Sequence, residues 1–181
     1  MKILLLLFIM LKTIDGSAQE LFQIDFSSSQ ELRYWNRVND SVMGGLSESN
    51  LRVEDNIAYF SGELSLKNNG GFASVRRLGP VYFQSHQRAI KVLVMGDGRT
   101  YQFRLRTNQG FDGMAYVATF STQADKWQTF EFNEDDFVAQ FRGRRIIDAP
   151  DLAFSQIEQL GLMLADKQPG EFVLAIKSIS Q

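Results

Sequence analysis

Short strand-type segments separated by turn signals are the feature that most restricts what this chain can fold into. Apolar and polar residues alternate in residues 22–26 and 101–106, which is the two-residue period of a half-buried strand, whereas residues 89–95 are nearly all apolar, as in a central strand. About ten such segments recur at intervals of roughly 8–12 residues, with no long helical pattern between them. They cover residues 22–26, 46–53, 57–66, 72–76, 89–95, 101–106, 114–120, 127–132, 160–164 and 171–179. This spacing predicts an all-β protein, either a sandwich or a barrel.

Residues 101–106 show the clearest alternation. Tyr101, Phe103 and Leu105 would face one side of the predicted strand. The opposite side would carry three polar side chains: Gln102, Arg104 and Arg106. Fifteen phenylalanines among 181 residues also indicate an aromatic core, as found where two sheets pack face to face.

Turn formers separate the predicted strands. The Asp-Asn pair at 55–56 predicts a hairpin turn, and the Asn-Asn-Gly-Gly run at 68–71 predicts another. Asp97, between two glycines, is interpreted as a residue of a further tight turn.

Two stretches are expected to contain short helical turns, near residues 133–145 and 151–159. Asn133 is predicted to cap the first, because the acidic residues 134–136 favour the start of a helix. The same acids raise the possibility of a calcium site. The spacing of a calcium-binding loop is absent, so a solvated acidic turn is the better interpretation. We predict no metal site and no cofactor.

The N-terminus has the composition of a secretory signal peptide. Lys2 precedes an unbroken apolar run at residues 3–11, shorter than the about 20 residues of a membrane-spanning helix. Small residues end at Ala18, so cleavage is predicted there; the alternatives are a buried helix and a retained anchor. Residues 19–181 are then expected to form one exported domain, periplasmic or secreted, with membrane contact only through an uncleaved leader.

The composition also excludes several kinds of chemistry. The chain has no cysteine, which rules out disulfides, zinc–thiolate sites and a cysteine nucleophile. His86 is the only histidine, and without a G-x-S-x-G motif it is interpreted as a solvated loop residue rather than a general base. No phosphate-binding glycine loop is present. The net charge of −2 gives no support to a nucleic-acid partner.

One stretch, WNRVNDSVMGGLS at residues 35–47, fits neither a regular strand nor a helix. Its Asn-Asp-Ser segment contains turn formers, and its glycine pair allows a positive φ or a close backbone approach. Its core-type residues are Trp35, Val38 and Val42. We interpret the stretch as a structured connection that turns sharply before the strand at residues 46–53.

With three later stretches, at residues 68–76, 96–101 and 170–172, this run resembles the signature of the complex I intermediate-associated protein 30 family. The resemblance extends from about residue 26 to residue 179 and implies a galactose-binding-like jelly-roll β-sandwich. The best-known members are mitochondrial assembly factors for respiratory complex I. It therefore implies an assembly or chaperone-like protein that binds a membrane-complex subunit or assembly intermediate. We predict that the protein is non-catalytic and monomeric. The apolar, arginine-poor leader differs from a mitochondrial transit peptide and favours export.

Polar residues in these family-like stretches form the candidate partner-binding or ligand-binding site. They are Asn39, Asp40, Asn69, Ser74, Arg76, Asp97 and Arg99. Each lies at a strand end or tight turn, so turns gathered at one end of a sandwich would form one polar patch. In the alternative, favoured here, Asp40 and Asp97 brace the turns through charge-assisted hydrogen bonds with Arg76 or Arg99.

Aromatic residues raise a second possible function, that of an exported carbohydrate-binding module. The candidates are Trp35, Tyr101, Tyr116 and Trp127. Aromatic faces can stack on sugar rings, although core positions are the better interpretation because large aromatics dominate interior packing. A glycan-active enzyme ranks third, since no pair of carboxylates can be placed across a cleft from the sequence. No catalytic residue is assigned.

Overall fold

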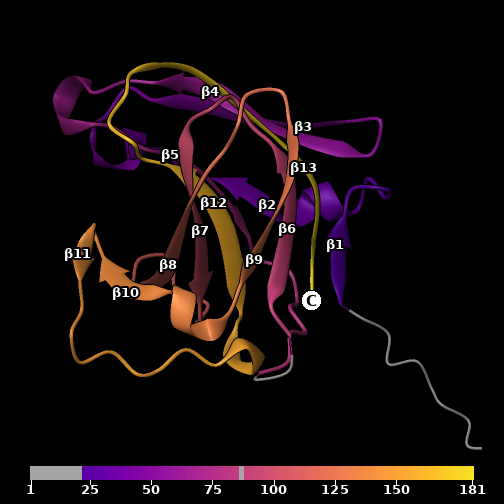
Figure 1. The fold of residues 1–181 in the computed structure, drawn as a ribbon. Coiled ribbons are helices and arrows are strands. Elements are labelled where there is room, and N and C mark those ends of the chain that lie inside the picture. The colour runs from indigo at the N-terminus through magenta and orange to yellow at the C-terminus, as the bar shows by residue number, and fades with distance from the viewer. Residues whose placement is uncertain (1–21, 86–87) are drawn as a thin grey trace, which may run out of the picture.

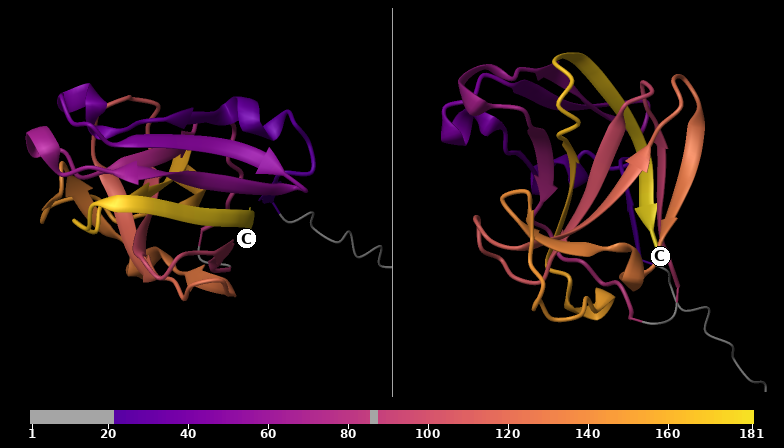
Figure 2. Two further views of the ribbon diagram at one scale, coloured as in Figure 1. Left: turned by 90° about the horizontal axis from the view of Figure 1, so that it is seen from above. Right: turned by 60° about the vertical axis from the view of Figure 1, so that its left-hand side comes forward.

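Two antiparallel β-sheets packed face to face form the molecule, as seen in a computed structural model that describes residues 22–85 and 88–181 (Figure 1). Figure 2 shows the two sheets as separate layers. The prediction of an all-β sandwich is confirmed. The predicted leader, residues 1–18, and His86 lie outside the described residues.

Sheet A has the long strand β13 near its centre. Its spatial order is β3 (Glu48–Glu54), β4 (Ile57–Leu64), β13 (Gly170–Ser180), β6 (Ile90–Met95) and β9 (Trp127–Phe132), and β1 (Gln23–Asp25) also pairs with β13. Because β13 bonds β1, β4 and β6, it holds the sheet together.

Sheet B has β7 and β12 near its centre. Its spatial order is β11 (Arg144–Arg145), β10 (Val138–Phe141), β8 (Ala115–Ser121), β7 (Thr100–Arg106), β12 (Gln159–Leu164), β5 (Ala73–Arg77) and β2 (Trp35–Arg37). The helical segments are short 3₁₀ turns: η1 (Glu31–Tyr34), η2 (Asp40–Met43), η3 (Lys67–Asn69), η4 (Glu134–Asp136) and η5 (Phe154–Gln156). No helix among the described residues is long and apolar enough to span a membrane.

The core lies between the sheets and is rich in aromatic rings, as expected. Tyr101, Phe103 and Leu105 are fully buried on the inner face of β7. Phe103 of sheet B packs against Phe132 of sheet A with ring centroids 5.5 Å apart, and Phe137 closes the cluster 5.8 Å from Phe132. Since inward and outward side chains alternate along a strand, Arg104 and Arg106 lie on the outer face of sheet B.

The turn chemistry follows the sequence closely. Asp55 and Asn56 both have positive φ, 50° and 61°, as a two-residue hairpin turn requires. Asn133 caps η4 as predicted, because its N–H donates to Asp136 Oδ2 at 2.7 Å and the reciprocal bond completes a capping box. The second predicted helical turn is η5.

Two element assignments differ from the sequence interpretation. Most of residues 133–145 forms the hairpin β10–β11 rather than a helical turn, because Arg142 and Gly143 both adopt positive φ and reverse the chain. Part of residues 35–47 is also a strand, since β2 pairs with β5, which lies far away in the sequence.

Candidate functional site

The sharp turn of residues 35–47 is centred on η2. Gly44 ends η2 with φ 88°, a left-handed conformation that glycine adopts without strain. Gly45 packs directly on Asp40, and a Cβ atom at this position would lie 2.3 Å from Asp40 Cγ. The glycine pair therefore provides both properties expected of it, a positive φ and a close approach.

Asp40 is buried beneath this turn and joins three chain segments. Its carboxylate accepts hydrogen bonds from the N–H groups of Ser47 (2.9 Å), Gly71 (2.6 Å) and Phe72 (3.2 Å), and from the Ser47 hydroxyl. Burial alone would raise the pKa of Asp40, but these hydrogen bonds together lower the pKa below its ordinary value. Asp40 is thus a brace for the turns, as favoured from the sequence, although its partners are backbone groups and a serine rather than an arginine.

Asn39 and Ser74 extend the same network. Asn39 Oδ1 accepts from the Ser49 hydroxyl at 2.7 Å and from the Ser74 N–H at 3.3 Å, and the Ser74 hydroxyl donates to Val38 O. Asn69 is exposed on η3, next to the glycines that contact Asp40. We call Asn39, Asp40, Asn69 and Ser74 the corner cluster.

Asp97 and Arg99 form a second braced turn. Asp97 accepts from the N–H groups of Arg99 (3.1 Å) and Val173 (2.9 Å), and the buried Tyr101 hydroxyl lies 3.1 Å from both of its carboxylate oxygens. The Arg99 guanidinium instead pairs with Asp166, at 2.9 Å from Nε and 2.7 Å from Nη2. The predicted ion pairs of Asp40 and Asp97 with Arg76 or Arg99 are therefore wrong, whereas the bracing role of both carboxylates agrees with the structure.

These two groups lie at the same end of the sandwich. Leu164, the last residue of β12, pairs with Ala73 at the start of β5 and with Tyr101 near the start of β7. The segment after β12 links the groups, because Asp166 bonds Arg99 and the Lys167 side chain lies against Gly71. Six of the seven predicted site residues therefore gather at one end.

Arg76 is the exception. It lies further along β5, opposite Asn36 and Gly161, on the outer face of sheet B. Its Nη1 donates to Phe111 O at 2.6 Å. The alternation along β5, in which Ala73 and Val75 point into the core, turns Arg76 away from both aspartates.

Three carboxyl groups, those of Asp25, Asp40 and Asp166, have a pKa below the ordinary value, and two of them, Asp40 and Asp166, lie at this end of the sandwich. Burial tends to raise the pKa of Asp166, but bonds from Arg99 and from the backbone lower it, as bonds lower that of Asp40. Both folded-state values lie below the unfolded value of about 3.9, so both carboxylates stabilise the fold fully above that pH and lose this effect as the pH falls through the folded-state values.

We therefore expect the melting temperature to be level from about pH 7 to pH 5 and to fall below about pH 4. Circular dichroism melts across this range measure the effect. A melting temperature unchanged down to about pH 2 would contradict it.

The same corner exposes apolar side chains that the sequence interpretation missed. Val42, Met43 and Leu46 are 59%, 66% and 54% exposed, and Leu66 on the adjoining segment is 41% exposed. We call these four residues the apolar corner. Trp35 and Val38 are buried as predicted, but Val42 is not a core residue, because η2 turns its side chain out of the sandwich.

The aromatic residues considered for sugar stacking are mainly in the core. Trp35, Tyr101 and Tyr116 are 8%, 0% and 4% exposed, which confirms the core interpretation for them. Trp127, at the start of edge strand β9, is 42% exposed and is the exception among the four.

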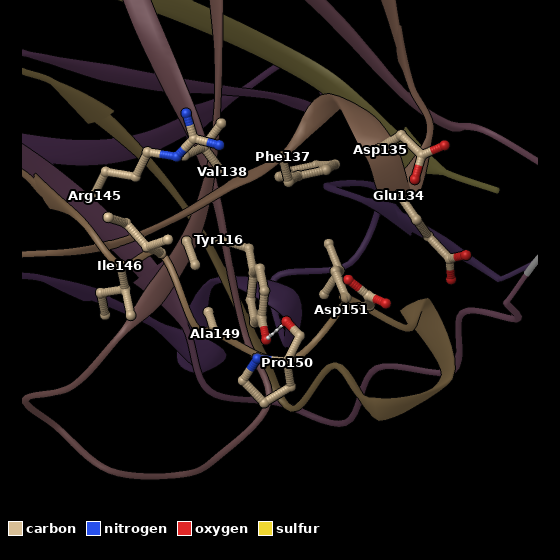
Figure 3. Close-up of a pocket in the computed structure, with 13 residues that line it drawn as sticks. Tyr116, Glu134, Asp135, Phe137, Val138, Arg145, Ile146, Ala149, Pro150 and Asp151 are labelled. Carbon is tan, nitrogen blue, oxygen red and sulfur yellow. Dashed lines mark hydrogen bonds between the residues drawn. The ribbon is translucent and has the colours of Figure 1, made fainter.

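A cavity of about 240 Å³ lies between β10 and the segment that follows β11 (Figure 3). The Tyr116 hydroxyl closes its floor by donating to Pro150 O at 2.8 Å. Figure 3 places Arg145 on the opposite side from the carboxylates of Glu134 and Asp135. Within residues 22–85 and 88–181, no three His, Cys, Asp or Glu side chains are grouped as metal ligands. The cavity contains none of the predicted site residues.

This two-sheet arrangement, with braced turns gathered at one end, is that of a galactose-binding-like jelly-roll β-sandwich. Among solved structures, the family 11 carbohydrate-binding module of a cellulosomal cellulase of Clostridium thermocellum has a TM-score of 0.63 with this chain at 16% identity, covering 90% of this chain and 95% of the module. The family 11 module of the same organism in complex with a β-1,3-1,4-mixed-linked tetrasaccharide has a TM-score of 0.61 at 15% identity, covering 87% and 94%. At this identity the similarity establishes the fold.

The sequence establishes the family. Residues 24–176 match the complex I intermediate-associated protein 30 family, and the chain belongs to it. "Complex I intermediate-associated protein 30, mitochondrial" of Mus musculus is 26% identical over an alignment of 176 residues, and the match covers 85% of this chain. The match covers 53% of the mouse protein, so the chain spans about half the length of this curated relative.

The prediction of an exported chain is wrong, because the curated relative is a mitochondrial protein. A short apolar run followed by small residues is a generic composition. The family match over residues 24–176 is far more specific.

Proposed function

We propose that the chain is a non-catalytic binding module that associates with a protein partner, a subunit or assembly intermediate of a membrane complex. The observation that carries the proposal is that residues 35–47 contain both a buried bracing residue and exposed apolar side chains. Asp40 is buried and braces the turn, whereas Val42 and Met43, within the next three residues, are exposed. A braced turn presenting apolar side chains is a pre-organised docking surface, and Met is enriched in the centres of protein interfaces.

Family membership supports a protein as the partner. The mouse relative is named for its association with an intermediate of complex I. A rigid corner also loses little conformational entropy when it binds, which favours association with a folded surface.

We expect the double change Val42→Ser and Met43→Ser to weaken partner binding at least about tenfold, because buried apolar anchors carry most of the binding energy of an interface. Affinity capture from detergent-solubilised membranes, with captured subunits quantified by mass spectrometry, measures this effect. The matched control is Ile147→Ser, which removes an 88% exposed apolar residue elsewhere. Both variants should melt close to the unaltered chain because the changed residues are exposed.

Equal capture by the double variant and the control would overturn the assignment of the corner. Glycan-array binding that vanishes on Trp127→Ala, with no captured protein, would replace the protein partner with a glycan. Turnover of a sugar polymer that one carboxylate substitution abolishes would overturn the non-catalytic assignment.

A further inference from the structure

Three arginines share the centre of the outer face of sheet B. Gly161 of β12 pairs with Arg76 of β5 on one side and with Arg104 of β7 on the other, and Gln159 pairs with Arg106. Gly161 has no side chain, so it does not separate the side chains of Arg76 and Arg104 on this face. Neighbouring strands lie about 4.8 Å apart, so the two arginines stand two strand spacings from each other. We call Arg76, Arg104 and Arg106 the arginine row.

The arginine row holds positive charges that are largely buried, and burial of an unpaired charge is unfavourable. Arg76 and Arg106 are 8% and 7% exposed, and no ion pair in the described part of the chain involves any of the three arginines. Burial, followed by the neighbouring arginines, lowers the pKa of Arg104 to about 10 and that of Arg106 to about 9. All three still carry charge at neutral pH. Asp112 acts on Arg76 and Arg106, but its exposed carboxylate bonds Arg142 at 2.6 Å.

Two buried polar atoms, one in the row and one on a residue paired with it, have no hydrogen-bond partner within the described residues. They are Arg106 Nε, a donor, and Gln159 Oε1, an acceptor. The Gln159 side chain is held by its Nε2, which donates to Asn108 O at 2.6 Å and Gly110 O at 3.2 Å, so its oxygen points elsewhere. An unsatisfied buried group costs about 1–3 kcal/mol, so an open donor and an open acceptor on two paired residues require an explanation.

We propose that the arginine row and Gln159 bind the oxyanion of a small hydroxylated acid, a sugar phosphate or a sugar acid. Guanidinium groups bind phosphate and carboxylate through two parallel N–H donors, and the anion would offset the repulsion within the row. Gln159 Oε1 would accept a hydroxyl of the same ligand. Since only 7% of Arg106 is exposed, a ligand would reach it with one small charged group rather than with an extended chain.

Phe111 supplies an apolar rim. Its ring lies over the Arg76 guanidinium, 5.3 Å from ring centroid to Cζ, and is 63% exposed. The ring of a ligand would pack on the exposed part of the Phe111 ring while the charged group of the ligand reaches the arginines. The site shares no residue with the apolar corner, so its test does not depend on the proposed protein partner.

Isothermal titration calorimetry at constant ionic strength tests the site with glucose 6-phosphate, glucuronate and inorganic phosphate, and with glucose as the neutral probe. We expect an anionic probe to bind with a Kd below about 1 mM and glucose not to bind. Arg106→Met should weaken that binding at least about tenfold. The control Arg52→Met removes the same charge from an exposed site on β3 of sheet A and should leave binding unchanged.

Stability gives a second readout. Without ligand, Arg106→Met should melt at or above the temperature of the unaltered chain, because it removes a buried, repelled cation. If it fails to fold, Arg104→Gln provides the same binding test at a half-buried position.

Tighter binding of phosphate compounds would assign a phosphate ligand, and tighter binding of glucuronate a carboxylate. The proposal is overturned if no anionic probe binds below about 1 mM, if glucose binds equally well, or if Arg52→Met weakens binding as much as Arg106→Met.

Discussion

Replacing Asp40 by Ala is expected to lower the free energy of unfolding by about 3–5 kcal/mol, because the change leaves three N–H groups beneath the corner without an acceptor. These belong to Ser47, which follows the turn, and to the neighbouring residues Gly71 and Phe72 of a second segment. Side-chain truncation also opens space against Gly45, which packs on the Asp40 carboxylate. For a chain of this size the loss corresponds to a fall in melting temperature of roughly 10 °C.

Urea denaturation measures this loss. Asp135→Ala is a suitable control, because its exposed carboxylate should change stability by less than about 0.5 kcal/mol. Below its melting temperature, Asp40→Ala should still capture the protein partner, although more weakly, because Val42 and Met43 remain exposed while the turn that presents them loses its brace. Unchanged stability together with lost capture would show that Asp40 is a binding residue rather than a brace.

The second large effect is expected for Asp166→Ala, at about 3–5 kcal/mol, because it leaves the Arg99 guanidinium without its hydrogen-bonded counter-charge. The side chains of this ion pair are only 12% and 5% exposed for Arg99 and Asp166. Arg99 also donates to Glu171 O at 3.0 Å, so the change should loosen the connection between β12 and β13.

A matched exposed pair provides the control. Asp112 and Arg142 approach to 2.6 Å, but their side chains are 57% and 61% exposed, so Asp112→Ala should cost no more than about 1 kcal/mol. Urea denaturation measures both losses in free energy of unfolding. Equal losses for Asp166→Ala and Asp112→Ala would show that the buried ion pair stabilises the fold no more than the exposed one.

The central strands could be predicted from the sequence because alternation is a local property. Residues 127–132 coincide with β9, and the Asp55-Asn56 turn follows from its residue types. The strands β2, β10 and β11 were missed because each is short and defined by its partner. Trp35–Arg37, for example, is a strand through its pairing with β5.

The site was predictable in its position but not in its contacts. Glycine and asparagine indicated the turns, but no local pattern shows that Asp40 meets Gly71, 31 residues away. The alternation along residues 101–106 did place Arg104 and Arg106 on one face. Their proximity to Arg76 depends on the strand order β7–β12–β5, which long-range pairing determines.

The position of β13 restricts the order in which the chain can fold during synthesis. Gly170–Ser180 separates β4 from β6, so the two halves of sheet A cannot join until this segment has left the ribosome. Synthesis adds roughly 5–20 residues per second, so the apolar inner faces of the strands made earlier stay incompletely packed for several seconds. Nascent chains of this protein should therefore depend on holdase chaperones until residue 180 emerges.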